Sequence, residues 1–179
     1  MSRHIADLQH ESTLEARGYS IICGVDEAGR GPLAGPVIAA AVILTPHSTP
    51  DGTLHAGLAD SKSLSQSQRE RALNVLKQHA IIGIGISEPE EIDRINILAA
   101  SLTAMQRAVA ALPYRPDAAL IDGNKTPELP CHAEALVKGD AKSLSVAAAS
   151  IVAKVTRDRI MVEAMDDSCN GAAEGFDAE

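Results

Sequence analysis

Residues 25–36 read Val25-Asp26-Glu27-Ala28-Gly29-Arg30-Gly31-Pro32-Leu33-Ala34-Gly35-Pro36, and they follow the apolar run 20–24. Two adjacent carboxylates therefore stand where a predicted buried strand breaks into a glycine-rich turn. Burying two anions side by side costs several kcal/mol unless a cation compensates them. Arg30 follows between two glycines, where backbone and guanidinium can approach a bulky anion closely. The sequence therefore predicts a bound cation at this turn.

The bulk composition is that of one domain of 179 residues, 45% of them hydrophobic. No stretch approaches the apolar length of a membrane span, and the N-terminus lacks the apolar core of a secretory signal. The three cysteines, Cys23, Cys131 and Cys169, have no disulfide or zinc spacing. We therefore expect a soluble, monomeric protein without a membrane partner, in a reducing and cytoplasmic setting.

The net charge of −8 argues against a nucleic-acid partner if it is taken as a sum. Its distribution is uneven, because residues 160–179 contain six acids and no Lys or Arg. Residues 138–159 contain five Lys or Arg against two Asp. A near-neutral body with a basic face can bind phosphate, so the charge distribution keeps a nucleic-acid partner open.

Strands and helices alternate along the chain, which predicts an α/β fold. The expected strands cover 19–25, 37–44, 81–86, 118–121 and 135–137. The expected helices cover 65–79, 97–112 and 144–165, with a further helix beginning at 89–93. No helix separates the first two strands, so we expect them to form an antiparallel hairpin within a mixed sheet.

Two further acids, Asp122 and Asp140, follow later predicted strands. Groups at strand ends in α/β folds converge on a common crevice. Four carboxylates gathered there would repel one another, unless hard divalent ions made them ligands; oxygen ligands favour magnesium or manganese over zinc. Taken singly, each Asp is equally a turn or cap residue, as in Asp122-Gly123-Asn124. Capping explains the adjacent pair Asp26 and Glu27 less well.

The segment Gly29-Arg30-Gly31 is not a nucleotide P-loop, because no Gly-Lys-Ser or Gly-Lys-Thr follows it. Its plainest interpretation is a tight turn stiffened by Pro32 and Pro36. A nucleotide-hydrolysing function is therefore disfavoured.

Basic side chains near the predicted crevice have two interpretations. Ser150, Lys154 and Arg157 are spaced by four and three residues, so they project from one helix face. Such a Lys and Arg are either solvated or hold a phosphate between them. Lys62 is either exposed or directed toward the crevice, and the sequence leaves both open.

Taken together, six segments between residues 20 and 162 resemble the ribonuclease HII family. They are 24–32, 60–62, 92–96, 121–124, 137–143 and 147–158. The resemblance implies a ribonuclease H-like fold, a mixed five-stranded sheet flanked by helices. It also implies an endoribonuclease that hydrolyses the RNA strand of RNA–DNA hybrids and incises 5′ of ribonucleotides embedded in duplex DNA. The implied mechanism uses two divalent ions, Mn²⁺ or Mg²⁺, and leaves 5′-phosphate and 3′-hydroxyl ends.

The resemblance also assigns roles to residues of this chain. The four acids implied to be catalytic and to bind the metal ions are Asp26, Glu27, Asp122 and Asp140. The turn implied to sense the ribose 2′-hydroxyl is formed by Gly29, Arg30 and Gly31. The favoured candidates for holding substrate phosphates are Lys62 and Lys154, with Lys138, Lys142 and Arg157 as further candidates.

The last part of the chain departs from the family pattern, which continues with Gly-Tyr-Gly-Phe and His-Lys-Gly-Tyr segments. We therefore expect a flexible arm over 1–18, a ribonuclease H-like catalytic domain over 19–165, and an acidic, divergent tail over 166–179. The C-terminal helical part is expected to be truncated, which would weaken substrate binding and blur specificity at the RNA–DNA junction. The alternative is a weakly active or inactive form that binds hybrids.

Overall fold

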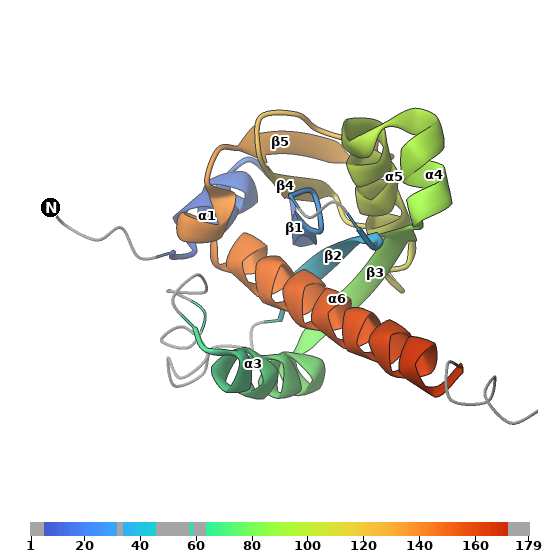
Figure 1. Ribbon diagram of the computed structural model, residues 1–179. Coiled ribbons are helices and arrows are strands. Elements are labelled where there is room, and N and C mark those ends of the chain that lie inside the picture. The colour runs from blue at the N-terminus through green and yellow to red at the C-terminus, as the bar shows by residue number, and fades with distance from the viewer. Residues whose placement is uncertain (1–5, 32–33, 46–57, 59–63, 172–179) are drawn as a thin grey trace, which may run out of the picture.

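The structure is a computed structural model that describes residues 6–31, 34–45, 58 and 64–171 (Figure 1). Its helices are α1 (Gln9–Ala16), α3 (Gln66–His79), α4 (Pro89–Ile95), α5 (Ile97–Ala110) and α6 (Leu144–Gly171), with the 3₁₀ helix η3 (Gly139–Ala141). Its strands are β1 (Ile22–Ala28), β2 (Val37–Leu44), β3 (Ala80–Ser87), β4 (Ala118–Asp122) and β5 (His132–Leu136). Within this part of the chain, no helix has the length and apolar character needed to cross a bilayer.

The strands form one mixed five-stranded sheet in the order β3-β2-β1-β4-β5. Strand β1 pairs antiparallel with β2, which confirms the predicted hairpin. On its other side β1 pairs parallel with β4, and β4 pairs parallel with β5. The central strand β1 therefore carries the acidic pair between neighbours of opposite direction.

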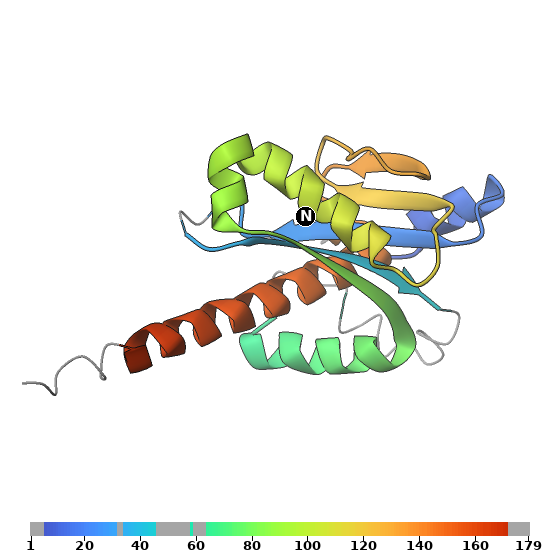
Figure 2. The ribbon, with the colours of Figure 1, turned by 90° about the vertical axis from the view of Figure 1, so that its right-hand side faces the viewer.

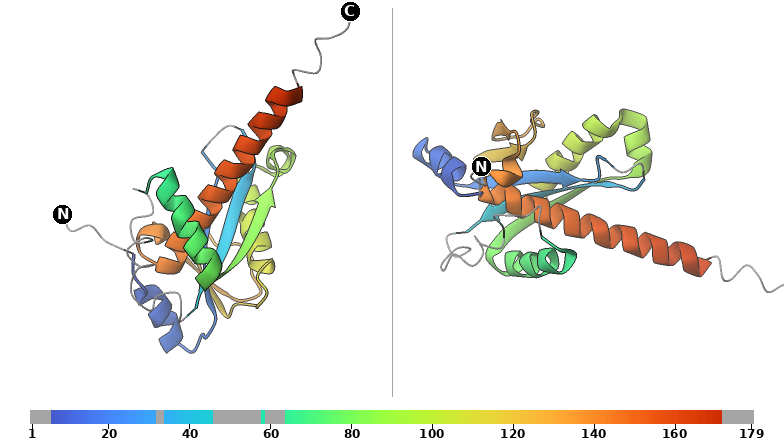
Figure 3. Two further views of the ribbon diagram at one scale, coloured as in Figure 1. Left: turned by 90° about the horizontal axis from the view of Figure 1, so that it is seen from below. Right: turned by 60° about the vertical axis from the view of Figure 1, so that its left-hand side comes forward.

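Helices cover both faces of the sheet. Figure 2 shows α4 and α5 on one face and α6 with α3 on the other, and Figure 3 shows α6 crossing the strands. Alternate residues of β2 supply both cores: Ala39 and Ala41 join the cluster under α5, and Ala40 and Val42 join the cluster under α6. Alanines on β2 and α6 keep the interface between helix and sheet thin, since small side chains let the two backbones approach closely.

Helix boundaries follow local capping chemistry. Ser65 begins α3 with a capping box, because its hydroxyl accepts from the Gln68 amide while the Gln68 side chain accepts from the Ser65 amide. Asn96 adopts a left-handed φ of 74° between α4 and α5. Its side chain accepts hydrogen bonds from the amides of Leu98 and Ala99, so one residue ends α4 and caps α5.

Four segments differ from the sequence expectations. The first strand covers Ile22–Ala28 rather than 19–25, so Asp26 and Glu27 lie within the strand and not after its end. The expected flexible arm over 1–18 contains helix α1, whose Leu14 is buried against β1 and β4. Its mixed polar pattern conceals this helix, because few of its side chains face the core. The last strand covers His132–Leu136 rather than 135–137, since a polar edge strand lacks an apolar signature. Helix α6 continues to Gly171, into the expected acidic tail.

Candidate functional site

The register of the two parallel strands brings the first pair of predicted acids together. Val25 pairs with Ile121, so the next residues in this register are Asp26 and Asp122. Neighbouring strands lie about 4.8 Å apart, and parallel strands end at the same edge of a sheet. Asp26 is only 5% exposed, so its carboxylate stands beside Asp122 with little water around it.

The acidic pair on β1 is electrostatically costly as it stands. Burial raises the pKa of Asp26 well above its usual range, and the charges of Asp122 and Glu27 raise it further. Burial also raises the pKa of Glu27, against the opposing effect of Arg30, whose Nη1 lies 3.0 Å from Glu27 Oε1. The buried Glu27 Oε2 has no hydrogen-bond partner among the described residues. The pair therefore has excess negative charge and an unused oxygen, which a bound cation would satisfy.

The fourth acid lies in a segment that we call the Asp140 turn, residues 138–145. It begins at Lys138, whose φ of 58° is left-handed, and continues into η3 with Asp140 buried. The Gly139 amide donates to Asp122 Oδ1 over 2.6 Å, so the turn is joined to the end of β4. A Cβ on Gly24 would lie 2.1 Å from the Ser145 carbonyl carbon, so the same turn lies directly on β1.

The acids on β1 are followed by the glycine-rich turn, of which residues 29–31 and 34–36 are described. Gly29 has a φ of +113°, a conformation that a side chain would strain. Arg157 of α6 is buried against this turn: its Nε donates to Pro36 O over 3.1 Å and its Nη2 to Ala34 O over 2.8 Å. A Cβ on Gly29 would lie 2.7 Å from Arg157 Nε, so the turn is folded closely around the guanidinium.

The predicted basic residues do not gather as expected. The interpretation of Arg157 as a phosphate holder is wrong, because its guanidinium is buried and bound to the turn carbonyls. Lys154 is half-exposed and pairs with Asp158, whose Oδ1 lies 2.7 Å from its Nζ. Lys62 lies outside the described residues.

The donor chemistry of the acids fits a hard divalent cation, since every predicted ligand atom is a carboxylate oxygen. Within the described residues, however, no group of three or more His, Cys, Asp or Glu side chains is arranged to hold one ion. Local donors already occupy one oxygen each of Asp26, Glu27 and Asp122. Each of these three carboxylates keeps a second oxygen, so Asp26, Glu27, Asp122 and Asp140 are the residues that would hold a divalent cation such as Mg²⁺ or Mn²⁺.

The sequence singled out Ser150 and Arg157 on one helix face, but it did not predict what either side chain contacts. Ser150 of α6 hydrogen-bonds to the Asp26 carboxylate and lowers its pKa, against the larger effect of burial. A polar residue in the alanine-rich run 147–153 was the available signal. Arg157 had no such signal, because a bond to backbone carbonyls leaves no mark on the residues that accept it.

Comparisons with known proteins agree with the fold and extend it. The family model described as Ribonuclease HII matches residues 23–175. A Ribonuclease HII of Ruegeria pomeroyi is 55% identical over 158 residues, which are 88% of this chain and 65% of that protein. A Ribonuclease HII of Maricaulis maris is 56% identical over 144 residues, 80% of this chain and 64% of that protein. The chain thus spans slightly less than two thirds of the length of these relatives.

A solved structure shows the same architecture. The crystal structure of the ribonuclease H2 from Pyrococcus horikoshii OT3 superposes with a TM-score of 0.72 and 29% identity. The superposition covers 82% of this chain and 76% of that one. The mixed sheet with helices on both faces is therefore an arrangement already seen in a solved ribonuclease.

Proposed function

The chain belongs to the ribonuclease HII family, and on that premise we propose that it is a metal-dependent endoribonuclease. Its substrates are RNA–DNA hybrids and duplex DNA with embedded ribonucleotides, which it incises on the 5′ side to leave 5′-phosphate and 3′-hydroxyl ends. One observation carries the proposal: the parallel register sets Asp26 beside Asp122, and the adjacent Glu27 has a buried oxygen with no partner in the described part of the chain.

The four acids divide the work of binding metal. Asp26 and Asp122 face each other from neighbouring strands, and Asp140 joins them on a turn whose amide is bonded to Asp122. When bound, Mn²⁺ or Mg²⁺ ions would lower the pKa of an attacking water and stabilise charge on the departing 3′ oxygen. The carboxylates hold and orient the ions, so no side-chain nucleophile is required.

The glycine-rich turn recognises the ribose. Backbone groups of residues 29–31 are close to the acids and carry no bulky side chain except Arg30, so they can approach a sugar. The 2′-hydroxyl distinguishes RNA from DNA and can both donate and accept. Arg30 also pairs with Glu27, which links recognition of the sugar to the carboxylates that hold the metal.

Phosphates of the duplex are held by lysines, with Lys154 and Lys62 as the candidates. The Lys154 ammonium is half-exposed, and its present partner Asp158 is a solvent-accessible carboxylate that a phosphate could replace. Contacts of this kind position a duplex without reading its sequence. The expected monomeric state and cytoplasmic location remain predictions of the sequence.

The test is a cleavage assay on a labelled RNA–DNA hybrid and on a duplex with one ribonucleotide, with Mg²⁺ or Mn²⁺. The wild-type chain should cut both, and Asp122→Asn should abolish turnover while leaving hybrid binding in place. Asp166→Asn is the matched control, because this carboxylate is exposed and lies sixteen residues beyond Ser150 along α6. Binding of the hybrid without turnover in either metal would favour the alternative, an inactive hybrid-binding form.

A further inference from the structure

We propose that Glu11 of helix α1 is a positioning residue that holds the Asp140 turn in place for metal binding. The inference rests on the proposed function, since it assigns a support to one of the proposed metal ligands. Helix α1 precedes the part of the chain that the family model matches, residues 23–175.

Glu11 is a buried carboxylate, 7% exposed, and its contacts converge on one end of the Asp140 turn. Its Oε1 accepts from Ser143 Oγ over 2.6 Å, from Ser145 Oγ over 2.6 Å and from the Ser145 amide over 3.0 Å. Charge-assisted bonds of this length are stronger than neutral ones. All three donors bind this one oxygen, while the buried Oε2 has no hydrogen-bond partner among the described residues, so the contacts to Ser143 and Ser145 are what compensates burial of the carboxylate.

The backbone beside Glu11 reinforces the same contact. Asp7 forms a parallel bridge with Ser143. The Leu144 amide donates to Asp7 O over 2.9 Å, and the Asp7 amide donates to Lys142 O over 3.3 Å. The segment from Asp7 to Glu11 therefore binds four consecutive residues of the turn, 142–145.

Asp140 lies between this contact and a second one. On its N-terminal side the Gly139 amide is bonded to Asp122, and on its C-terminal side residues 142–145 are bonded to α1. Within the turn, the amides of Lys142 and Ser143 both donate to Gly139 O. Removing the Glu11 carboxylate leaves only the backbone bonds of Asp7 at this end of the turn, so the backbone of Asp140 is held less firmly.

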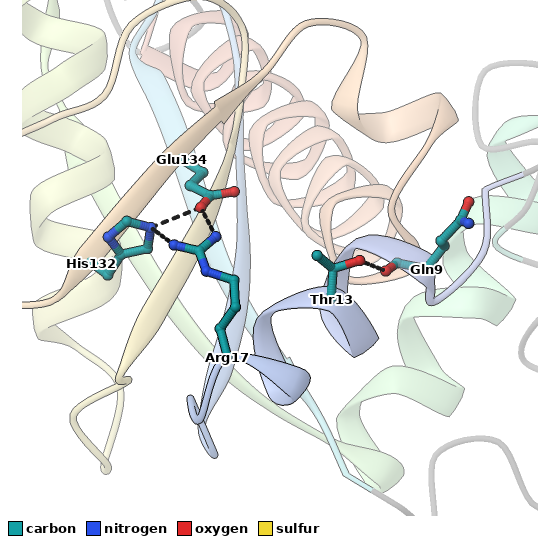
Figure 4. Close-up of polar contacts among 5 residues, drawn as sticks. All are labelled: Gln9, Thr13, Arg17, His132 and Glu134. Carbon is teal, nitrogen blue, oxygen red and sulfur yellow. Dashed lines mark hydrogen bonds and ion pairs between the residues drawn. The ribbon is translucent and has the colours of Figure 1, made fainter.

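Helix α1 is also held at its C-terminal end. It can therefore keep Glu11 in place, rather than move together with the Asp140 turn. Figure 4 shows Arg17, just after α1, directed toward Glu134 and His132 of β5. Arg17 pairs with Glu134, whose Oε1 also lies 2.8 Å from His132 Nε2. Tyr19 stacks on the His132 ring with centroids 5.0 Å apart.

The experiment compares Glu11→Ala and Glu11→Gln with Glu15→Gln in the full chain. Glu15 lies one helical turn further along α1 and is exposed, so its variant changes the charge of the helix without touching the turn. Outer residues that orient metal ligands commonly affect metal affinity or activity by about 10–100-fold. Glu11→Ala should lower kcat and raise the Mn²⁺ concentration for half-maximal activity by about that range, with KM for the hybrid nearly unchanged. Glu11→Gln should lie between, because its amide oxygen can still accept.

Hydrogen–deuterium exchange of the metal-free proteins provides a readout independent of activity. Exchange should rise in residues 138–145 of both Glu11 variants and stay at the wild-type level in residues 29–36. A uniform rise in exchange, or a metal requirement equal to that of Glu15→Gln, would overturn the inference and leave Glu11 a purely structural residue. If the wild type fails to cleave, the proposed function fails, and localised exchange still decides the role of Glu11.

Discussion

Two turns flank the acidic edge of the sheet, and a buried charged side chain from a distant segment holds each of them. Arg157 holds the glycine-rich turn by donating to the carbonyls of Ala34 and Pro36. Glu11 holds the Asp140 turn by accepting from the hydroxyls of Ser143 and Ser145. The guanidinium binds main-chain carbonyls alone and sets a backbone shape, whereas the carboxylate binds two hydroxyls beside one amide and so depends on the identity of those side chains.

The two supports therefore differ in what they fix: Arg157 fixes the shape of a backbone, and Glu11 fixes the position of a carboxylate. In the proposed function the glycine-rich turn brings its backbone close to a sugar, and Arg157 fixes that backbone while its own guanidinium stays buried. The Asp140 turn carries a carboxylate. Its support, Glu11, must therefore fix the Asp140 side chain relative to Asp122. Each turn should therefore fail in its own way when it is altered.

Asp140→Asn should produce the largest effect, because it removes charge while it keeps the turn. Loss of a metal-binding carboxylate forfeits several kcal/mol of stabilisation in the transition state, which is roughly a 10³-fold fall in kcat. Arg30→Gln, in the glycine-rich turn, should lower kcat/KM by only about tenfold, the worth of about 1.4 kcal/mol. Steady-state cleavage of one hybrid by both variants measures the contrast. Equal losses would mean that the two turns do not differ in this way.

Gly29→Ala should damage the glycine-rich turn through shape alone. Its φ of +113° and the short approach to Arg157 predict strain of about 1–3 kcal/mol in the free energy of unfolding. Gly31→Ala is the matched control for stability, because a Cβ at Gly31 meets nothing within 4 Å. Urea unfolding of the two variants tests the prediction. A stable Gly29→Ala would show that Arg157 does not constrain the turn.

The acids between the turns predict a pH dependence of stability. A carboxyl whose pKa is raised by folding, as burial raises that of Asp26, binds its proton more tightly in the folded state. In chelator, the free energy of unfolding should therefore fall as pH rises from about 4, the ordinary carboxyl pKa, through the raised value. Above that value this group should cause no further loss.

Asp26→Asn removes this titrating carboxyl, so the free energy of unfolding should depend less on pH. At pH 8, the free energy of unfolding of the metal-free variant should exceed that of the metal-free wild type. The difference should be about 1 kcal/mol for each unit by which folding raises the pKa of Asp26. Mn²⁺ should then stabilise the wild type more than the variant. Urea unfolding between pH 4 and 8 measures both effects, and parallel curves for the two proteins would contradict the assignment.

Lys154→Gln should have the smallest effect, since its ion pair with Asp158 is half-exposed and worth under about 1 kcal/mol. If Lys154 contacts a phosphate, the variant should bind hybrid more weakly whatever its sequence, and the salt slope of binding should fall by about one. Fluorescence anisotropy at several salt concentrations gives the slope. An unchanged slope would remove Lys154 from the proposed interface.

Much of the fold was predictable because its signals are local. The apolar run before Asp26 predicts a buried strand and the missing helix between β1 and β2 predicts a hairpin, and the structure contains both. The convergence of Asp26 and Asp122 was predictable because parallel strands end at one edge. The residues that support the two turns were not predictable from local patterns. Glu11 lies 132 residues from Ser143, and Arg157 lies 121 residues from Pro36, so no local pattern relates them.

Helix α6 connects the two turns, and its length sets the distance between them. It begins at Leu144, inside the Asp140 turn, and reaches Arg157 after thirteen residues, or about 20 Å at the usual rise per residue. The separation between the C-terminal end of the Asp140 turn and Arg157, which binds the glycine-rich turn, is therefore set by the number of residues along one helix. Inserting or deleting a single residue between them would shift Arg157 by about 1.5 Å and rotate it by about 100°. Substitutions between Leu144 and Arg157 leave the length of this stretch unchanged, whereas an inserted or deleted residue changes it.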